Sequence, residues 1–268
     1  MSSKTSALRL QVESSLAARA AKSDTSRLHA GMLSPFQHRE HPTIEAVPTG
    51  APPIDQLAGG FPRGCLTEIY GPPCSGRSSL LISALASRTA ASEVCALVDA
   101  RDAFDPHSAQ AAGVKLAQLL WVRCRNVDQA LRATDLLIQG GGFGLIALDL
   151  GDTPPQLVRY IPLQAWFRFR RVVEHTPTIF LVIEQESNAK TCASLVLSLR
   201  MQETLWSHTG NAESGRGISW HSTGCLLEGR AIRAEMIRSH SERTRLQSSI
   251  ASFEVSVPGG SMPESAAH

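Results

Sequence analysis

The stretch Gly71–Ser79, with the sequence GPPCSGRSS, has the spacing G-x-x-x-x-G-K-[ST] of a phosphate-binding loop. It departs from that motif at one position, because Arg77 stands where the motif has lysine. The apolar run Leu66–Tyr70 precedes it and the helix-like run Ser78–Leu85 follows it, which is the strand, loop and helix order that such a loop requires. A glycine-rich turn before a helix can also be a plain chain reversal, but the spacing and order together favour a binding loop.

The loop predicts a degenerate nucleotide site that would take ATP and Mg²⁺. Its glycines let backbone N–H groups approach phosphates, and the start of the following helix adds partial positive charge. The planar guanidinium of arginine is bulkier than the compact ammonium of lysine, so binding can persist while catalytic alignment is lost. The residues expected to form this part of the site are Gly71, Cys74, Ser75, Gly76, Arg77, Ser78 and Ser79.

Three further stretches around the loop carry a family resemblance. Residues 48–64 resemble the lead-in of the RecA recombinases, Glu68–Pro72 repeats their E-I-Y-G-P, and Val98–Pro106 is similar to their I-D-A-E-H-A-L-D-P. The resemblance covers roughly residues 46–240 and implies an α/β fold. This would be a RecA-like P-loop core with a mainly parallel, doubly wound sheet and antiparallel closing strands at 226–238.

The spacing of apolar runs agrees with a doubly wound sheet, because short runs alternate with helical segments. One helical segment follows Asn126, which can cap it, and ends at Gly140. The expected strands are at 66–70, 94–98, 118–122, 145–150, 178–183 and 194–199.

The resemblance also predicts that ATP hydrolysis is lost. In the family, the glutamate of I-D-A-E is the general base, and Arg101 occupies the matching position. A guanidinium stays protonated at neutral pH and cannot accept the proton of the attacking water. Asp99 and Asp102 are carboxylates nearby, and Asp102 is a weak candidate for a substitute base. With Arg77 in the loop, we therefore expect no catalytic residue.

Three other positions keep the family residue type. Asp105 matches the adenine-side aspartate, and Gln185 matches the glutamine that senses the terminal phosphate. Asp149, after the apolar run 145–148, matches the aspartate that would hold Mg²⁺ together with Ser78. Asp149 could equally cap a strand end, and Gln185 could be a remnant that only hydrogen-bonds the end of its strand.

The regions that would grip DNA differ from the family. Only residues 186–192 separate Gln185 from the next apolar run, so the long DNA-binding loop is missing. The segment 166–171 interleaves aromatic residues with arginines and could contact DNA or a partner protein. Alternatively, it is an amphipathic helix with Trp166, Phe169 and Val173 in the core. The candidate contact residues are Trp166, Arg168, Arg170 and Arg171.

Length and composition set the remaining expectations. The 268 residues suit one α/β domain with flanking segments, namely an N-terminal helix and linker (1–45), the core (46–240) and a polar, disordered tail (241–268) that holds an isolated strand-like run at 253–257. The 26 lysine and arginine residues nearly balance 24 aspartate and glutamate residues, so no overall field favours nucleic acid. Six scattered cysteines favour neither a metal site nor a disulfide framework. No membrane span or signal peptide is evident, so we expect a cytoplasmic protein.

A RecA-like core with a degraded nucleotide site and a trimmed DNA loop is similar to the ImuA-type accessory proteins of bacterial translesion mutagenesis. This resemblance implies a role in the SOS response to DNA damage. The implied partners are an inactive Y-family polymerase relative and an error-prone replicative-type polymerase, with DNA or RecA as further partners. The alternatives are a divergent recombinase that binds ATP and single-stranded DNA, and a cell-division inhibitor resembling SulA that would bind FtsZ.

Overall fold

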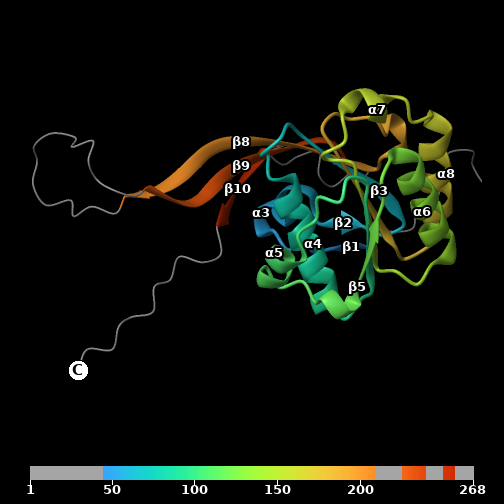
Figure 1. Ribbon diagram of the computed structural model, residues 1–268, viewed down its shortest axis with the longest axis horizontal. Helices are drawn as coiled ribbons and strands as arrows, with labels where there is room; N and C mark the ends of the chain where they lie inside the picture. The colour runs from blue at the N-terminus through green and yellow to red at the C-terminus, as the bar shows by residue number, and fades with distance from the viewer. Residues whose placement is uncertain (1–44, 209–224, 240–249, 257–268) are drawn as a thin grey trace, which may run out of the picture. The chain divides into compact units, whose positions relative to one another are not determined.

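The computed structural model describes residues 45–208, 225–239 and 250–256. They belong to the second of two compact units of the chain, Ile44–His268. The expected N-terminal helix and linker lie outside the described residues, except for Glu45. The described residues form an eight-stranded sheet with the strand order β10-β9-β8-β3-β7-β6-β4-β5 (Figure 1).

Six neighbouring strands of this sheet run parallel, and at one edge β9 pairs antiparallel with β8 and β10 pairs antiparallel with β9. This confirms the expected α/β fold with a mainly parallel sheet and antiparallel closing strands. The parallel strands are β3 (Cys65–Tyr70), β4 (Cys95–Asp99), β5 (Leu119–Arg123), β6 (Leu145–Asp149), β7 (Ile179–Glu184) and β8 (Leu195–His208). The antiparallel strands are β9 (Cys225–Ser239) and β10 (Ile250–Ser256).

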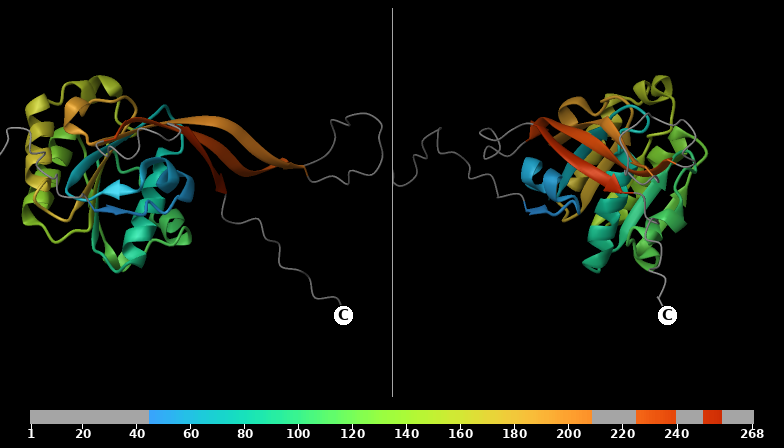
Figure 2. Two further views of the ribbon diagram at one scale, coloured as in Figure 1. Left: turned by 180° about the vertical axis from the view of Figure 1, so that it is seen from behind. Right: turned by 90° about the vertical axis from the view of Figure 1, so that its left-hand side faces the viewer.

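Helices cover both faces of the sheet (Figures 1 and 2). One face packs against α3 (Pro52–Ala58), α4 (Arg77–Ala90) and α5 (Pro106–Ala111). The other face packs against α6 (Val127–Gly140), α7 (Pro155–Arg159) and α8 (Leu163–Val173). Two short 3₁₀ helices, η1 (Leu116–Gln118) and η2 (Lys190–Cys192), precede β5 and β8.

Each central strand contributes side chains to the hydrophobic cores on both faces of the sheet, because its side chains alternate between the two faces. In β6, Leu145 and Ala147 belong to the core under α4, whereas Ile146 and Leu148 belong to the core under α8. All four are fully buried. Complete burial of a leucine or isoleucine side chain contributes about 1.5–3 kcal/mol, so this two-sided packing dominates the stability of the sheet.

The sequence marks of α6 are also present in the structure. The side chain of Asn126 accepts a hydrogen bond from the backbone N–H of Gln129 at 2.9 Å, which caps the start of the helix. The helix ends at Gly140, before Gly141 in the left-handed region with φ +66°. Cap and terminator therefore act as the sequence predicts.

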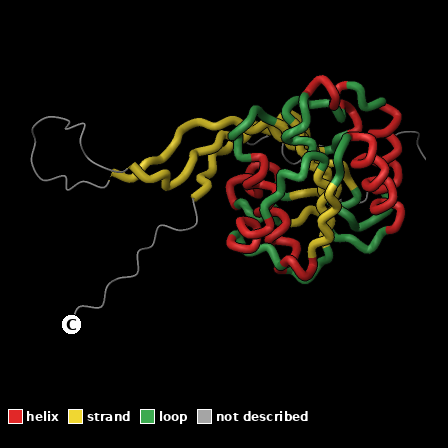
Figure 3. Tube along the Cα trace, viewed as in Figure 1, coloured by secondary structure: helices red, strands yellow, loops and turns green. Residues whose placement is uncertain are grey.

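The closing strands differ from expectation at their C-terminal end. The paired strands β8 and β9 extend beyond the helices, and β10 pairs with β9 along the outer edge (Figures 1 and 3). Residues 250–256 were expected in a disordered tail, but Phe253 is buried at 8% exposure and packs into the core with α3. The expected disorder is corrected for these residues, which pair with β9 along the whole of β10 and include most of the strand-like run expected at 253–257.

A smaller antiparallel sheet precedes the main one. It pairs β1 (Ala46–Val47) with β2 (Phe61–Pro62), and α3 connects the two strands. No helix within the described ranges has both the length and the apolar character needed to cross a membrane.

Candidate nucleotide site

The loop between β3 and α4 has the backbone of a phosphate-binding loop. Gly76 has φ +89° and Cys74 has φ +63°, so both lie in the left-handed region. Gly71 has no room for a side chain, because a Cβ there would lie 2.2 Å from the carbonyl oxygen of Leu199. Helix α4 begins at Arg77 without a side-chain cap, which leaves the N–H groups of its first turn available to an anion.

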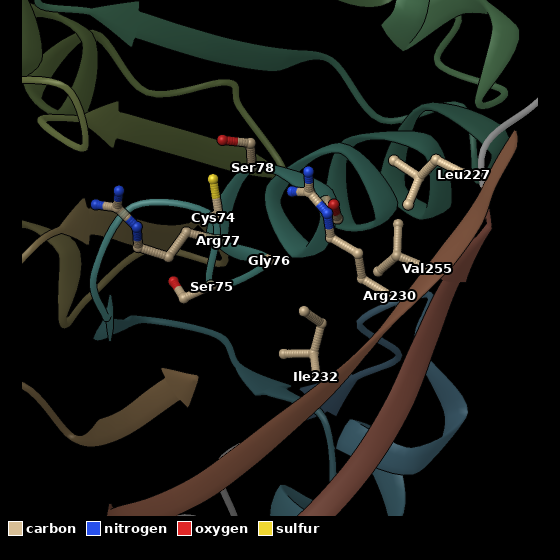
Figure 4. Close-up of a pocket in the computed structure, with 10 residues that line it drawn as sticks. Cys74, Ser75, Gly76, Arg77, Ser78, Leu227, Arg230, Ile232 and Val255 are labelled. Atoms are coloured by element: carbon tan, nitrogen blue, oxygen red, sulfur yellow. The ribbon is translucent and has the colours of Figure 1, made fainter. Parts of the chain in front are cut away.

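A pocket of about 280 Å³ lies against this loop (Figure 4). This volume lies just below the range of about 300–1,000 Å³ that is typical of small-molecule sites. Ser75 is buried, and its hydroxyl group has no hydrogen-bond partner among the described residues. The lining combines six expected loop residues with a second wall from β9 and β10: Cys74, Ser75, Gly76, Arg77, Ser78, Ser79, Leu227, Arg230, Ile232 and Val255.

The second wall was missed by the sequence analysis, although the alternation of β9 contains a signal for it. Ile232 is buried, so Arg230, two residues earlier, lies on the same inward face. A Cβ at Gly76 would lie 2.9 Å from Cγ1 of Ile232, which shows how closely β9 approaches the loop. The structure directs Arg230 toward the pocket (Figure 4).

Arg77 does not take the position of a loop lysine. Its guanidinium lies on the opposite side of Gly76 from Arg230 in Figure 4. Its Nη1 atom donates a hydrogen bond to the carbonyl oxygen of Gly151 at 3.1 Å. The same oxygen accepts a bond from Nε2 of Gln185 at 2.9 Å. Two side chains expected to meet phosphate therefore hold the loop that follows β6.

Gly151 also links Arg77 to Asp149. The backbone N–H of Gly151 donates to Oδ1 of Asp149 at 2.8 Å, so this residue bridges the carboxylate and the guanidinium. Desolvation raises the pKa of Asp149 to about 6, and the charges of Asp99 and Asp152 act in the same direction. The N–H of Gly151 and the charge of Arg77 oppose this rise. Desolvation likewise lowers the pKa of the Arg77 guanidinium, while Asp149 raises it.

The arrangement fits the binding of a phosphate ligand better than its hydrolysis. The uncapped start of α4 and the exposed Ser78 can meet a phosphate, and Ser78 and Asp149 would hold its Mg²⁺. Arg77 is fixed on Gly151 and does not fit the role of the lysine that contacts terminal phosphates.

The carboxylates near the expected general base have structural partners. Asp99 is buried and accepts hydrogen bonds from the N–H groups of Arg101 and Phe104, at 3.1 and 2.9 Å. Asp102 forms a bidentate ion pair with Arg123, and this contact lowers the pKa of Asp102. A lowered pKa makes Asp102 a poorer proton acceptor, so the geometry disfavours it as a substitute base.

Asp105 serves as the N-cap of α5. Its carboxylate accepts hydrogen bonds from the N–H groups of His107 and Ser108, both at 3.1 Å, and from the Ser108 hydroxyl. The hydrogen bond from the Ser108 hydroxyl makes the largest contribution to lowering the pKa of Asp105. Asp105 does not line the pocket described above, so its expected contact with adenine stays a prediction.

The short segment after Gln185 is fixed from one side by a buried glutamate. Oε1 of Glu68 accepts hydrogen bonds from the N–H groups of Asn188 and Ala189, at 2.7 and 2.9 Å. Its Oε2 atom accepts one from the hydroxyl of Ser187 at 2.8 Å. Three donors on one carboxylate hold residues 187–189 against β3.

Two arginines hold the end of the same segment. Arg170 of α8 donates to the carbonyl of Thr191 at 3.4 Å, and Arg238 of β9 donates to the carbonyl of Lys190 at 2.5 Å. A segment anchored by β3, α8 and β9 has little freedom to wrap a DNA strand. Arg170 thus has a structural contact that the sequence analysis did not foresee.

A second buried carboxyl group lies beside Glu68. Glu184, at the end of β7, is fully buried, and its Oε2 atom accepts a hydrogen bond from Nδ2 of Asn188 at 2.6 Å. Its Oε1 atom has no partner among the described residues. Desolvation, with a further contribution from Glu68, raises the pKa of Glu184 to about 8, whereas Asn188 lowers it. Glu184 is therefore largely protonated at neutral pH.

The segment 166–171 forms part of α8. This helix is amphipathic, as in the second of the two interpretations that the sequence allowed. Trp166 is 1% exposed and packs edge-to-face against Phe169, with ring centroids 6.2 Å apart. The expected contact of Trp166 with DNA or a partner is therefore wrong, because its ring belongs to the core. Arg168 is exposed and forms an ion pair with Asp135 of α6 at 3.0 Å, whereas Arg171 is exposed.

Comparisons with known proteins agree with this geometry. The family model described as the RecA N-terminal domain matches residues 20–153, which is half of the chain and includes the loop, Arg101 and Asp149. The chain is 37% identical over 121 residues to protein RecA of Cutibacterium acnes, covering 44% of this chain and 35% of that protein.

Other RecA proteins match over a longer stretch at lower identity. Protein RecA of Deinococcus radiodurans is 32% identical over 158 residues, covering 53% of this chain and 44% of that protein. Protein RecA of Leifsonia xyli subsp. xyli is 32% identical over 162 residues, covering 54% and 45%. The matches thus span less than half the length of these relatives. The chain belongs to the RecA N-terminal domain family.

Proposed function

We propose that this chain is a non-hydrolysing RecA-type accessory protein that helps to assemble error-prone polymerases at damaged DNA. The main observation behind this proposal is the hydrogen bond from Arg77 to the carbonyl of Gly151, beside Asp149. The guanidinium of Arg77 is thereby engaged in a contact within the protein. The proposed role is that of the ImuA-type proteins in SOS-induced translesion mutagenesis.

The residues at and beside the expected general-base position support the non-hydrolysing part of this proposal. A water that attacks a terminal phosphate must lose a proton, and Arg101 cannot accept it. Asp99 and Asp102 are engaged in the contacts given above. ATP and Mg²⁺ can still bind: the loop backbone would hold the phosphates, and Mg²⁺ would neutralise their charge. ATP that binds without being hydrolysed would act as a structural element or as a slow switch.

The anchored segment after β7 supports the loss of recombinase activity. Glu68, Arg170 and Arg238 hold residues 187–191 to the body of the domain. The side-chain amide of Gln185 donates hydrogen bonds to the carbonyls of Gly151 and Thr153, at 2.9 and 3.3 Å. It is therefore engaged within the protein and not directed at a phosphate. A signal from nucleotide to a DNA loop has no evident route through these contacts.

A divergent recombinase is the second candidate, and one observation favours it. The glycine loop and the uncapped start of α4 keep the geometry for binding phosphate. This candidate requires Arg77 to leave Gly151 when ATP binds, and it requires an unconventional base. It predicts ATP turnover that single-stranded DNA stimulates.

The test of the proposed role is co-purification from the cells in which the protein naturally occurs. We expect the tagged chain to recover an inactive Y-family polymerase relative and an error-prone replicative-type polymerase after DNA damage. Failure to recover either polymerase from damaged cells would overturn the proposal.

Damage-induced mutation frequency in a deletion strain gives an independent readout. The wild-type gene and the Arg101→Ala variant should both restore mutagenesis, because the proposed role needs no catalysis at that exposed position. A requirement for Arg101 in this assay would count against a purely structural role.

A further inference from the structure

Two arginines line the pocket at the phosphate-binding loop, and they differ in their contacts. The guanidinium of Arg77 donates to the carbonyl of Gly151, beside Asp149. The guanidinium of Arg230 has neither a hydrogen bond nor an ion pair within the described part of the chain. Arg230 is half-buried and extends from β9 toward α4 (Figure 4). A cation that faces a pocket in this way is available to an anionic ligand.

The pairing of the closing strands fixes the direction of Arg230. Arg230 pairs with Val255 of β10, and Ile232 pairs with Phe253, so these four side chains share one face of the two strands. Ile232 and Phe253 are buried in the core. The buried pair anchors this face of the strands, and Arg230 is therefore held over the pocket by regular sheet structure.

A β-bulge extends the same face along β9. Two consecutive residues of β8 pair with Gly229 and with Leu227, so Glu228 is an extra residue of β9. One extra residue reverses the alternation of side chains and brings Leu227 to the side of Arg230. Both side chains line the pocket. Bulges of this kind redirect side chains next to binding sites, and this one places an apolar group beside the cation.

The lining of the pocket carries positive charge. Its charged members among the described residues are Arg77 and Arg230. Two carboxylates lie near Arg230 along the closing strands, but Glu228 is exposed at the bulge and Glu254 lines an adjacent cavity with residues 50–53. Neither of these two glutamates forms an ion pair with Arg230. The charge inside the pocket thus favours an anion.

The other groups of the pocket are of the kind that holds phosphate. The first turn of α4 has no side-chain cap, and Ser78 and Ser79 belong to the lining. Ser75 is 1% exposed, and its hydroxyl group has no partner among the residues that the structure describes. The planar fork of a guanidinium matches the geometry of phosphate oxygens. The volume of about 280 Å³ suits a phosphate chain better than a complete nucleotide.

We propose that Arg230 of β9, and not Arg77, supplies the side-chain cation that binds the phosphates of a nucleoside triphosphate at this loop. The proposal deepens the proposed function, on which it rests for the choice of ATP as the ligand. The phosphates would lie between the N–H groups of the loop and the guanidinium of Arg230. A bound ligand would thereby join α4 to β9, one of the strands that extend beyond the helices (Figure 1).

Isothermal titration calorimetry with ATP and Mg²⁺ tests the proposal on the full-length chain. Arg230→Gln should weaken binding at least about tenfold, because it removes a charge-assisted hydrogen bond to phosphate. Arg230→Lys keeps the charge and should retain part of the affinity. Arg233→Gln is the matched control and should bind like the wild type, since Arg233 lies on the same strand but is exposed on the opposite face.

Inorganic tripolyphosphate shows which part of the ligand Arg230 contacts. It should compete with ATP for the wild type, and Arg230→Gln should weaken both ligands by a similar factor. A lack of competition, or a loss of affinity confined to ATP, would place the contact at the nucleoside and overturn the proposal.

Hydrogen exchange gives a readout that does not depend on the size of the affinity change. Saturating ATP should slow exchange in the first turn of α4 and at residues 227–232 of the wild type. In Arg230→Gln the effect on α4 should remain, whereas the effect on β9 should be lost. Equal protection of β9 in both proteins overturns the proposal. Thermal melting without ligand should show that both variants of Arg230 are folded, because this side chain has no partner among the described residues.

The outcomes separate this proposal from the proposed function. A wild type that binds neither ATP nor tripolyphosphate overturns the contact at Arg230, and so does equal binding by the wild type and Arg230→Gln. Neither result bears on the recovery of polymerases from damaged cells, which tests the proposed function. If the polymerases are not recovered while Arg230→Gln loses affinity for both ligands, the proposed function fails and the phosphate contact stands.

Discussion

Replacement of Glu184 by glutamine should change how the stability of the domain depends on pH. Glu184 is fully buried beside Glu68, and its pKa is raised from 4.5 to about 8. The unfolded chain loses this proton near pH 4.5, whereas the folded chain keeps it until about pH 8. Between these values the folded state binds the extra proton, so the free energy of unfolding falls as pH rises.

The size of the effect follows from the same two pKa values. Each pH unit in the middle of this window costs about 1.4 kcal/mol, and the slope falls off near each pKa, so the loss between pH 5 and pH 8 is roughly 3 kcal/mol. Glutamine resembles the protonated carboxyl group in shape and does not titrate. Glu184→Gln should therefore match the wild type at pH 5 and exceed its stability by roughly 3 kcal/mol at pH 8.

Urea unfolding at pH 5, 6, 7 and 8 is the assay for this prediction. With a urea slope of about 2 kcal/mol per M, the midpoint of the variant at pH 8 should lie about 1 to 2 M above that of the wild type. Glu186→Gln is the matched control: Glu186 is partly exposed and forms a surface ion pair with Arg159 worth at most about 1 kcal/mol. Parallel pH profiles of the wild type and Glu184→Gln would refute the assignment of a buried proton to Glu184.

Two further substitutions test the packing of the site and of α8. Gly71→Ala should destabilise the domain by several kcal/mol or prevent folding, because the new Cβ would lie 2.2 Å from the carbonyl oxygen of Leu199. Gly140→Ala has open space around it and should change the urea midpoint little, so similar losses in both variants would contradict this account. Trp166→Ala should cost about 3–5 kcal/mol as a fully buried aromatic, whereas Arg171→Ala should stay within about 0.5 kcal/mol. Thermal or urea unfolding decides this comparison, and a mild effect at Trp166 would mean that its ring is not part of the core.

Much of the fold could be predicted from the sequence because its signals are local. The motif in residues 71–79 defines a strand, a loop and a helix, and the apolar runs mark the six parallel strands. The cap at Asn126 and the glycines after α6 are likewise local signals. The strand β10 was harder, because its strand-like run stands isolated in a polar stretch and its pairing with β9 is not visible in the local pattern.

The direction of individual side chains could not be predicted in the same way. Arg77 meets the carbonyl of Gly151, which lies on a different strand end, and no local pattern contains that contact. In segment 166–171, arginines and aromatics alternate so closely that the sequence alone fits either a binding surface or a buried helix face. The rotation of α8, set by packing against Phe180, resolves this choice and buries Trp166.

The most direct test of the central claim is ATP hydrolysis by the purified chain, with and without single-stranded DNA. The Arg77→Lys/Arg101→Glu double variant, which restores the family residues at both positions, should be measured in parallel. We expect no turnover by the wild type under either condition, because Arg77 is held by Gly151 and the position of the general base carries a cation. Turnover by the wild type that rises with single-stranded DNA would contradict the account and identify an active recombinase.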